Sequence, residues 1–191
     1  MDKTLKACSS LLPAMILGLL SSCASTPTTS EALLNRMLSA GSRDARSPEK
    51  VVVDAQEVKM RNEERFRRVH RLLEEGRIRT SREQMLASLV LLGSNTPADV
   101  TLARDLALEA AEAGEEEAFS LAARAIDRSL YFTGAPQRFG THYIYSPVLS
   151  RWKLHDVDPR TTDEERSAYG LPPLADLEAF ASKLDASMQA P

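Results

Sequence analysis

Four glycines divide the chain into stretches of helical periodicity, and this spacing constrains the possible fold more than any other feature. Apolar residues recur three and four positions apart between the glycines, as they do on the buried face of a helix. Glycine readily adopts the backbone conformation that ends a helix. Ends at Gly41, Gly76, Gly93 and Gly114 predict helices over 31–40, 48–75, 82–92 and 97–113.

Only Gly114 separates the helix that ends at Ala113 from the next predicted helix, over 115–132. So short a connection makes the two helices antiparallel neighbours. Small side chains would let them approach closely, and these are Ala107, Ala110, Ala111, Ala118 and Ala122. The pair resembles one tetratricopeptide or Sel1-like unit. No fixed-period repeat extends it, so a solenoid is not predicted.

Beyond Gly134 the residue pattern changes, and residues 138–155 mix aromatic and β-branched residues. We predict a small β-hairpin or an irregular arm there, because Ser146-Pro147 interrupts the alternation. Short helices are expected over 163–168, capped by Thr162, and over 173–187. The fold class is therefore mainly α, a helical bundle with a small β decoration, in a single domain over 48–187.

The N-terminus has the parts of an export signal. Lys3 and Lys6 precede an apolar stretch, Leu11 to Leu20, that is too short for a transmembrane helix of about 20 residues. The following Leu20-Ser21-Ser22-Cys23 resembles the recognition site of the lipoprotein signal peptidase. This resemblance implies a signal peptide over 1–22, lipidation of Cys23 with acyl chains such as palmitate, and a flexible tether over 23–47. The membrane would be one partner, through that lipid.

The residue after the lipidated cysteine bears on localisation. It is Ala24 rather than aspartate, which resembles lipoproteins sent to the outer membrane, so the expected location is the periplasmic face of that membrane. Cys8 would leave with the signal peptide, so the mature protein would hold together by packing alone. The net charge of −3 does not suggest binding to nucleic acid.

One segment carries a family resemblance. Asp127-Arg128, then five residues, then Gly134-Ala135-Pro136-Gln137-Arg138-Phe139-Gly140-Thr141 resembles the signature of a helical bacterial family of unknown function. Asp163-Glu164-Glu165-Arg166 and Gly170-Leu171-Pro172-Pro173-Leu174 are similar to its closing segment. The resemblance implies no reaction. This chain has His142 where relatives often have glutamine, and Leu91-Leu92-Gly93 where they often have Gln-His-Gly, which weakens an enzymatic inference.

Two interpretations of this segment stay open, a ligand site and a structural clamp. In the first, Asp127 and Arg128 face a ligand together with loop residues, namely Gln137, Gly140, Thr141 and His142. In the second, Asp127 accepts loop amides and Arg128 donates to loop carbonyls, which holds 134–142 on the bundle. We prefer the second, because an aperiodic segment needs partners for its backbone groups.

Other candidate chemistry is sparse. His155-Asp156-Val157-Asp158 lacks further ligands at metal-binding spacing, so neither a metal nor a cofactor is predicted. Common hydrolase, metalloprotease and phosphate-binding motifs are missing from the sequence. Arg61, Arg65 and Arg68 share a helix face, which suits either anionic headgroups or, as we prefer, a solvated surface with neighbouring glutamates. His70 is expected on that surface.

The resulting hypothesis is a lipid-anchored envelope protein whose helical domain is a non-catalytic binding or assembly module. Its partner would be an envelope protein or a cell-wall polymer. One alternative is a hydrolase of cell-wall or glycan material with Asp127 and His142 as catalytic residues. Another is a small-molecule-binding domain that uses the 127–142 region without chemistry.

Overall fold

The computed structural model describes residues 29–45 and 55–189, and this part of the chain is mainly helical. Two strands form a small antiparallel hairpin, so the expected mainly-α class with a β-hairpin is confirmed. The elements are α1 (Thr29–Ala45), α2 (Ala55–Glu74), α3 (Ser81–Leu91), α4 (Pro97–Glu112), α5 (Glu117–Phe132), β1 (Tyr143–Ser146), β2 (Arg151–Leu154), α6 (Asp163–Ala168) and α7 (Leu174–Gln189).

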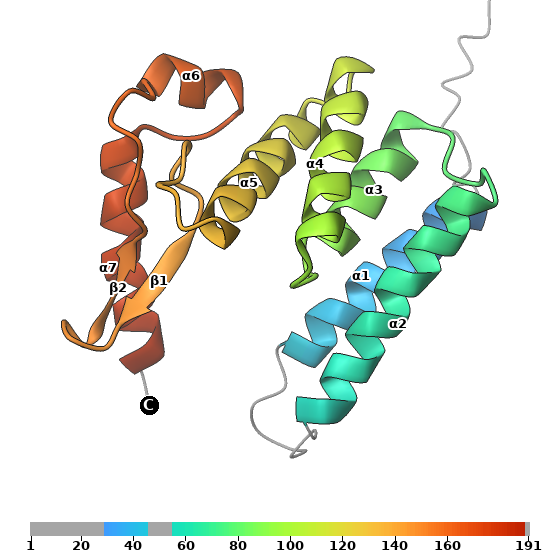
Figure 1. The fold of residues 1–191 in the computed structure, drawn as a ribbon, viewed down its shortest axis with the longest axis horizontal. Coiled ribbons are helices and arrows are strands. Elements are labelled where there is room, and N and C mark those ends of the chain that lie inside the picture. Colours follow the sequence, from blue (N-terminus) through green and yellow to red (C-terminus); the bar gives the residue numbers. More distant parts are fainter. Residues whose placement is uncertain (1–28, 46–54, 190–191) are drawn as a thin grey trace, which may run out of the picture.

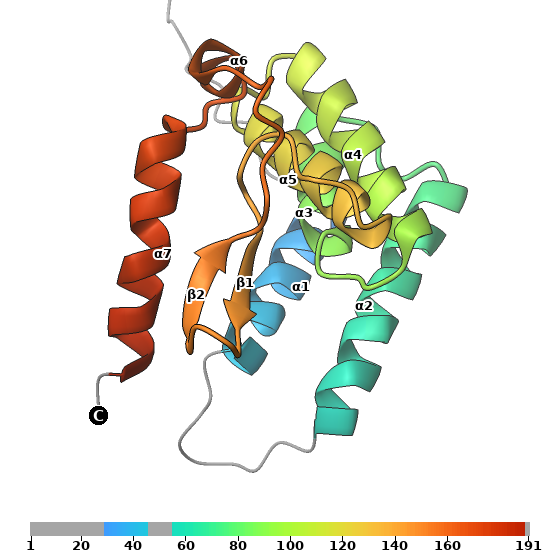
Figure 2. The ribbon, with the colours of Figure 1, turned by 60° about the vertical axis from the view of Figure 1, so that its left-hand side comes forward.

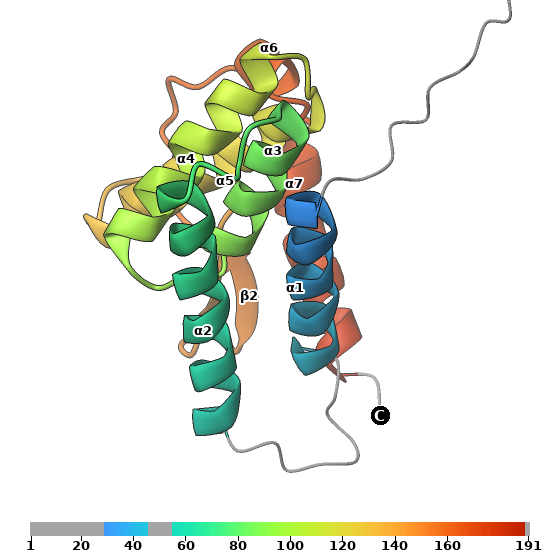
Figure 3. The same ribbon diagram turned by 90° about the vertical axis from the view of Figure 1, so that its right-hand side faces the viewer.

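The helices α3, α4 and α5 form the centre of the molecule (Figure 1). The antiparallel pair α1 and α2 lies on one side of them, and the hairpin with α7 lies on the other (Figures 1 and 3). The short helix α6 sits at the end of the molecule opposite the hairpin tip (Figure 2). None of the described helices is long and apolar enough to cross a membrane.

Capping residues set the helix starts. Thr96 accepts a hydrogen bond from the Asp99 amide, and Pro97 opens α4, as the sequence predicts. Thr162 caps α6 in a capping box with Glu165. The helix α3 starts at Ser81, one residue earlier than expected, because Thr80 is its cap.

The core is centred on the α3–α4–α5 layer. Alanines make up much of the buried surface of α4 and α5, and Ala103, Ala107, Ala110, Ala118 and Ala122 are all fully buried. The chain reverses between these helices at Gly114, whose φ of 103° is one that side chains disfavour. The predicted antiparallel pair is therefore present, although α5 begins at Glu117 rather than at residue 115.

The helix α1 belongs to the domain rather than to a tether. Leu34 is fully buried and Met37 nearly so, both within the main core. The helix runs through Gly41 to Ala45, past the expected end, since a single glycine is tolerated inside a helix that packing holds. The expected domain start at residue 48 therefore moves upstream to α1. The predicted helical stretch 48–54, the signal peptide and Cys23 lie outside the described residues.

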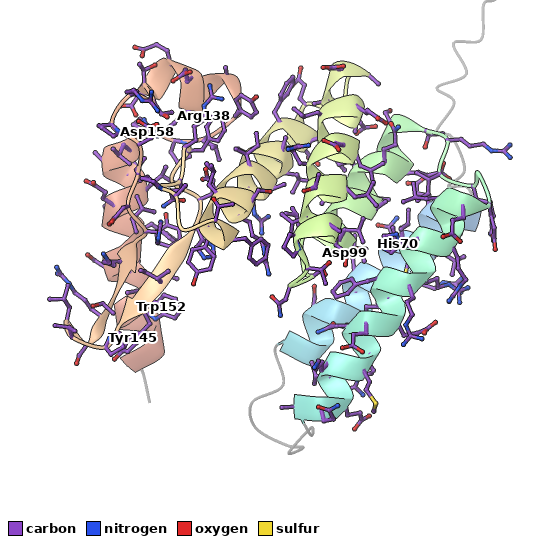
Figure 4. The ribbon with its side chains drawn as sticks, in the orientation of Figure 1. His70, Asp99, Arg138, Tyr145, Trp152 and Asp158 are labelled. Carbon is purple, nitrogen blue, oxygen red and sulfur yellow. The ribbon has the colours of Figure 1, made fainter. Side chains whose placement is uncertain are left out.

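The hairpin is shorter than the 138–155 arm. Tyr143 pairs with Leu154, and Tyr145 pairs with Trp152, whose ring centroid is 5.9 Å from that of Tyr145 (Figure 4). The Tyr143 hydroxyl donates to the Leu177 carbonyl at 3.0 Å, which fastens the hairpin to α7. A hairpin of two strands is marginally stable alone, so it relies on α7 for its packing.

Candidate functional site

Asp127 is the centre of the 127–142 region. This fully buried residue lies near the end of α5. Its Oδ1 accepts the amides of Arg138 (2.7 Å) and Phe139 (2.8 Å), and its Oδ2 accepts the amide (2.9 Å) and hydroxyl (2.8 Å) of Thr141. A carboxylate has about four lone-pair sites, and the loop occupies all of them. The carboxylate therefore holds the loop and has no free lone pair for a substrate.

Gln137 is also fully buried, and it joins the two ends of the hairpin. Its Nε2 donates to the carbonyls of His142 (3.0 Å) and His155 (2.8 Å), and its Oε1 accepts the His142 amide (2.8 Å). Its backbone amide donates to Asp156, and its carbonyl accepts from Asp158. The Gln137 side chain thus adds to the direct hydrogen bond from the His155 amide to the His142 carbonyl (3.0 Å) and fastens both segments together.

Gly140 and Arg166 complete this framework. Gly140 has a φ of 88°, and a Cβ there would lie 3.1 Å from Leu177 Cδ1. Arg166 is buried and donates to the Phe139 carbonyl (Nε, 3.2 Å) and to the Thr161 carbonyl (Nη1, 3.0 Å). In the sequence, Arg166 stands out only as part of the closing segment, because no local pattern shows that it reaches back to the loop.

His142 lies beside aromatic rings rather than in a hydrogen-bonded pair with Asp127. Its ring centroid is 4.4 Å from that of Tyr131 and 6.5 Å from that of His155. Burial and the positive charge of Arg128 lower the pKa of His142, and Asp127 only partly opposes them. Asp127 and His142 therefore lie in the same region, as predicted. The Asp127 carboxylate, however, faces the loop amides and not the His142 ring.

Arg128 points elsewhere. Its Nη1 donates to the Leu92 carbonyl at 2.9 Å and its Nη2 to Asn95 Oδ1 at 2.8 Å, both in the α3–α4 connection. The expectation that Arg128 bonds to the 134–142 loop is therefore wrong. Consecutive residues of a helix point about 100° apart, so Asp127 and Arg128 serve different neighbours.

A cleft with two lobes lies alongside Arg128. The first lobe, of about 810 Å³, lies between α2 and the α3–α4 connection. The second lobe, of about 580 Å³, lies among α1, α2, α3 and α5. Asn62, Phe66 and Gly93 line both lobes, so the two lobes are adjacent.

The first lobe contains a hydrogen-bonded histidine–aspartate pair that the sequence does not reveal. His70 Nε2 lies 2.7 Å from Asp99 Oδ1, with His70 on α2 and Asp99 at the start of α4 (Figure 4). The Ser94 hydroxyl donates to Asp99 Oδ2 at 2.5 Å. Burial alone would raise the pKa of Asp99, but hydrogen bonds from Ser94, His70 and Thr96 lower it overall. The two residues are 29 positions apart, so only the tertiary structure reveals the pair.

The second lobe differs in charge from the first. Arginines of α2 and α5 contribute to its lining, and the other lining residues are mostly apolar: Met37, Leu38, Phe66, Leu89, Val90 and Leu92. No group of three or more histidine, cysteine, aspartate or glutamate residues that could hold a metal ion occurs within 29–45 and 55–189. The cleft therefore offers cations, apolar surface and one histidine–aspartate pair.

Compared with protein-family profiles, curated proteins and solved structures, the chain gives no match.

Proposed function

We propose that this chain is a lipid-anchored protein of the cell envelope, and that its helical domain is a binding module without catalytic activity. The N-terminal pattern that ends in Cys23 supports the anchor. The location proposed is the periplasmic face of the outer membrane, because Ala24 follows the cysteine. The ligand or partner would come from the envelope, such as a wall fragment, a lipid or another envelope protein.

The observation that carries the binding proposal is the two-lobed cleft. Cavities of about 300–1,000 Å³ with apolar walls and a few polar groups are typical of ligand sites, and each lobe falls in that range. The 127–142 region supports a ligand site less well, because the side chains of Asp127 and Gln137 are occupied by the loop.

Thermal unfolding of the unlipidated mature chain (residues 23–191 with Cys23→Ser) tests this proposal. Fractions of a bacterial envelope extract should contain one that stabilises the chain, since a ligand at 100 times its Kd contributes about 2.7 kcal/mol. For a domain of this size the melting temperature would rise by about 5–10 °C. Asn62→Trp should abolish the rise by filling the cleft, because Asn62 lines both lobes.

Asn35→Trp is the matched control, because Asn35 is exposed on α1 outside the cleft lining. It should leave the ligand-induced rise unchanged. A screen in which no fraction stabilises the chain, or in which Asn62→Trp responds like the parent, would refute the cleft as the binding site.

A second candidate, hydrolysis of cell-wall or glycan material, is favoured by one observation only. The pair of His70 and Asp99 lies in the larger lobe, and such a pair can act as a general base toward water. Hydrolysis of envelope polymer that is lost in His70→Gln and retained in His142→Gln would favour this candidate. Absence of turnover by the parent chain would exclude it.

A further inference from the structure

The charged residues that line the second lobe of the cleft are all positive. Its lining contains three arginines, Arg65 of α2 and Arg124 and Arg128 of α5, and no acidic residue among the described ones. The chain as a whole has a net charge of −3, so this concentration of positive charge runs against its composition. Arginine recognises carboxylates and phosphates through paired N–H donors.

Arg128 is half-buried, and the groups to which it donates are uncharged. It donates to the Leu92 carbonyl and the Asn95 side-chain oxygen, and it lies over the Phe132 ring at 5.9 Å. Burial and the nearby charge of Arg124 lower the pKa of Arg128. A cation that is partly removed from water without a carboxylate is costly. An anion in the lobe would offset that cost.

Arg124 stands one turn before Arg128 on α5 and is exposed. Within the described part of the chain, its guanidinium has no hydrogen bond or ion pair. Like charges four residues apart on a helix repel each other, so their own helix gains nothing from this pair. An anionic group between the two guanidinium groups would convert the repulsion into attraction.

The rest of the lining limits the kind of anion. Met37 and Leu38 of α1, Phe66 of α2, and Leu89 and Leu92 of α3 form an apolar wall beside the arginines. An inorganic anion would leave this apolar wall exposed to water. A ligand with an apolar tail would cover it, and the lobe of about 580 Å³ can hold a molecule of drug size.

We propose that this lobe binds an amphipathic anion with a single acyl or alkyl chain. Arg124 and Arg128 would hold its carboxylate or phosphate headgroup, and its tail would lie along the wall formed by α1, α2 and α3. This inference rests on the proposed binding function and specifies the ligand class. A membrane-bound phospholipid shares the headgroup chemistry, and the experiment below separates it from a free amphiphile.

Binding of dodecanoate and dodecyl phosphate to the unlipidated mature chain, below their micelle concentrations, is the direct test. Both should bind, whereas neutral dodecanol should bind at least 10-fold more weakly and inorganic phosphate should not bind at millimolar concentration. Each buried methylene raises affinity by about fourfold at most, so decanoate should bind up to about 15-fold more weakly than dodecanoate. Equal binding of dodecanol and dodecanoate would overturn the proposal.

Arginine variants locate the headgroup. Arg124→Gln should weaken dodecanoate binding by about 10-fold or more without lowering the melting temperature, because Arg124 is exposed and makes no hydrogen bond or ion pair within the described residues. Arg128→Gln should weaken it as well, provided that its melting curve shows a folded chain. Arg36→Gln, an exposed position on α1, is the matched control and should bind like the parent. Unchanged binding in Arg124→Gln would overturn the proposal.

Vesicles separate the two sources of the headgroup. The unlipidated chain should not sediment with phosphatidylglycerol vesicles more than with phosphatidylcholine vesicles. Arginine-dependent sedimentation without binding of monomeric dodecanoate would mean surface contact with lipid and would overturn the proposal. If an envelope fraction stabilises the chain through Asn62 but no amphiphile binds, the binding function stands and this ligand class falls.

Discussion

At the scale of single residues, the buried polar side chains around the 134–142 loop act as clamps on its backbone. The carboxylate of Asp127 and the amide of Gln137 satisfy backbone groups that an irregular loop would otherwise bury without partners. Arg166 does the same for the carbonyls of Phe139 and Thr161. These residues position the hairpin and α7, and the open cleft lies on the other side of α5.

Because the Asp127 carboxylate holds the loop, we expect Asp127→Asn to destabilise the fold. The variant keeps the side-chain shape, but one oxygen becomes a donor that faces the N–H groups of the loop. Hydrogen bonds to charged groups contribute about 1.5–3 kcal/mol each. We expect a loss of about 3 kcal/mol or more, which lowers the melting temperature by about 6–12 °C. Thermal unfolding measures it.

Asp105→Asn is the matched control for this substitution. Asp105 is partly exposed on α4 and pairs only with its neighbour Arg104, so its loss should change the free energy of unfolding by less than about 1 kcal/mol. Similar melting temperatures for Asp127→Asn and Asp105→Asn would show that the loop does not depend on the Asp127 carboxylate. The 127–142 region would then become the better candidate for a ligand site.

The lowered pKa of His142 predicts a pH dependence of stability. Burial, Arg128 and His155 all disfavour the protonated ring in the folded chain, whereas the unfolded ring has a pKa of about 6.5. The unfolded chain therefore binds the proton more readily. The contribution of the neutral ring is present above about pH 6.5 and is lost as the pH falls below it. Between pH 7.5 and pH 5.5, the free energy of unfolding, measured with urea, should fall more for the parent than for His142→Gln. An equal fall in both chains would contradict this.

At the scale of elements, local sequence signals predicted most of the helices. Caps at Thr96 and Thr162 and the turn at Gly114 lie where the pattern puts them, because capping and glycine effects act within a few residues. The interactions that define the site are not local. His70 bonds to Asp99 and Arg128 to Leu92 across separate helices, and no periodicity encodes which helices become neighbours.

The helix α1 gives the clearest test at this scale, since the sequence suggested a tether there. Leu34 is fully buried in the main core. Leu34→Ala should cost about 2–5 kcal/mol, as a leucine does in a well-packed core. Chemical denaturation measures the loss, and Asn35→Ala, exposed on the same helix, should change stability by less than about 0.5 kcal/mol. A neutral Leu34→Ala would mean that α1 does not pack on the domain.

At the scale of the whole molecule, the start of α1 and the tip of the hairpin lie on opposite sides of the central helices (Figure 1). The helix α1 has 17 residues and so spans about 25 Å. Thr29 follows Cys23 by six positions, a stretch that can reach about 20 Å at most. If Cys23 carries lipid, the end of the domain at which α1 begins must face the membrane, and the hairpin tip must point away from it.

This geometry predicts two distinct probe environments in the lipidated protein. A fluorophore on Glu74→Cys, at the end of α2, should be quenched by a quencher carried on lipid headgroups, because this end of α2 and the start of α1 lie at a similar height (Figure 3). A fluorophore on Val148→Cys, which is 92% exposed at the hairpin tip, should not be quenched. A lipidated Cys23 has no thiol to label, so each variant carries one probe.

With Cys23→Ser, both signals should become insensitive to the quencher and the protein should leave the membrane fraction. Quenching at position 148 alone would reverse the orientation, and a Cys23→Ser chain that still sediments with membranes would refute the anchor.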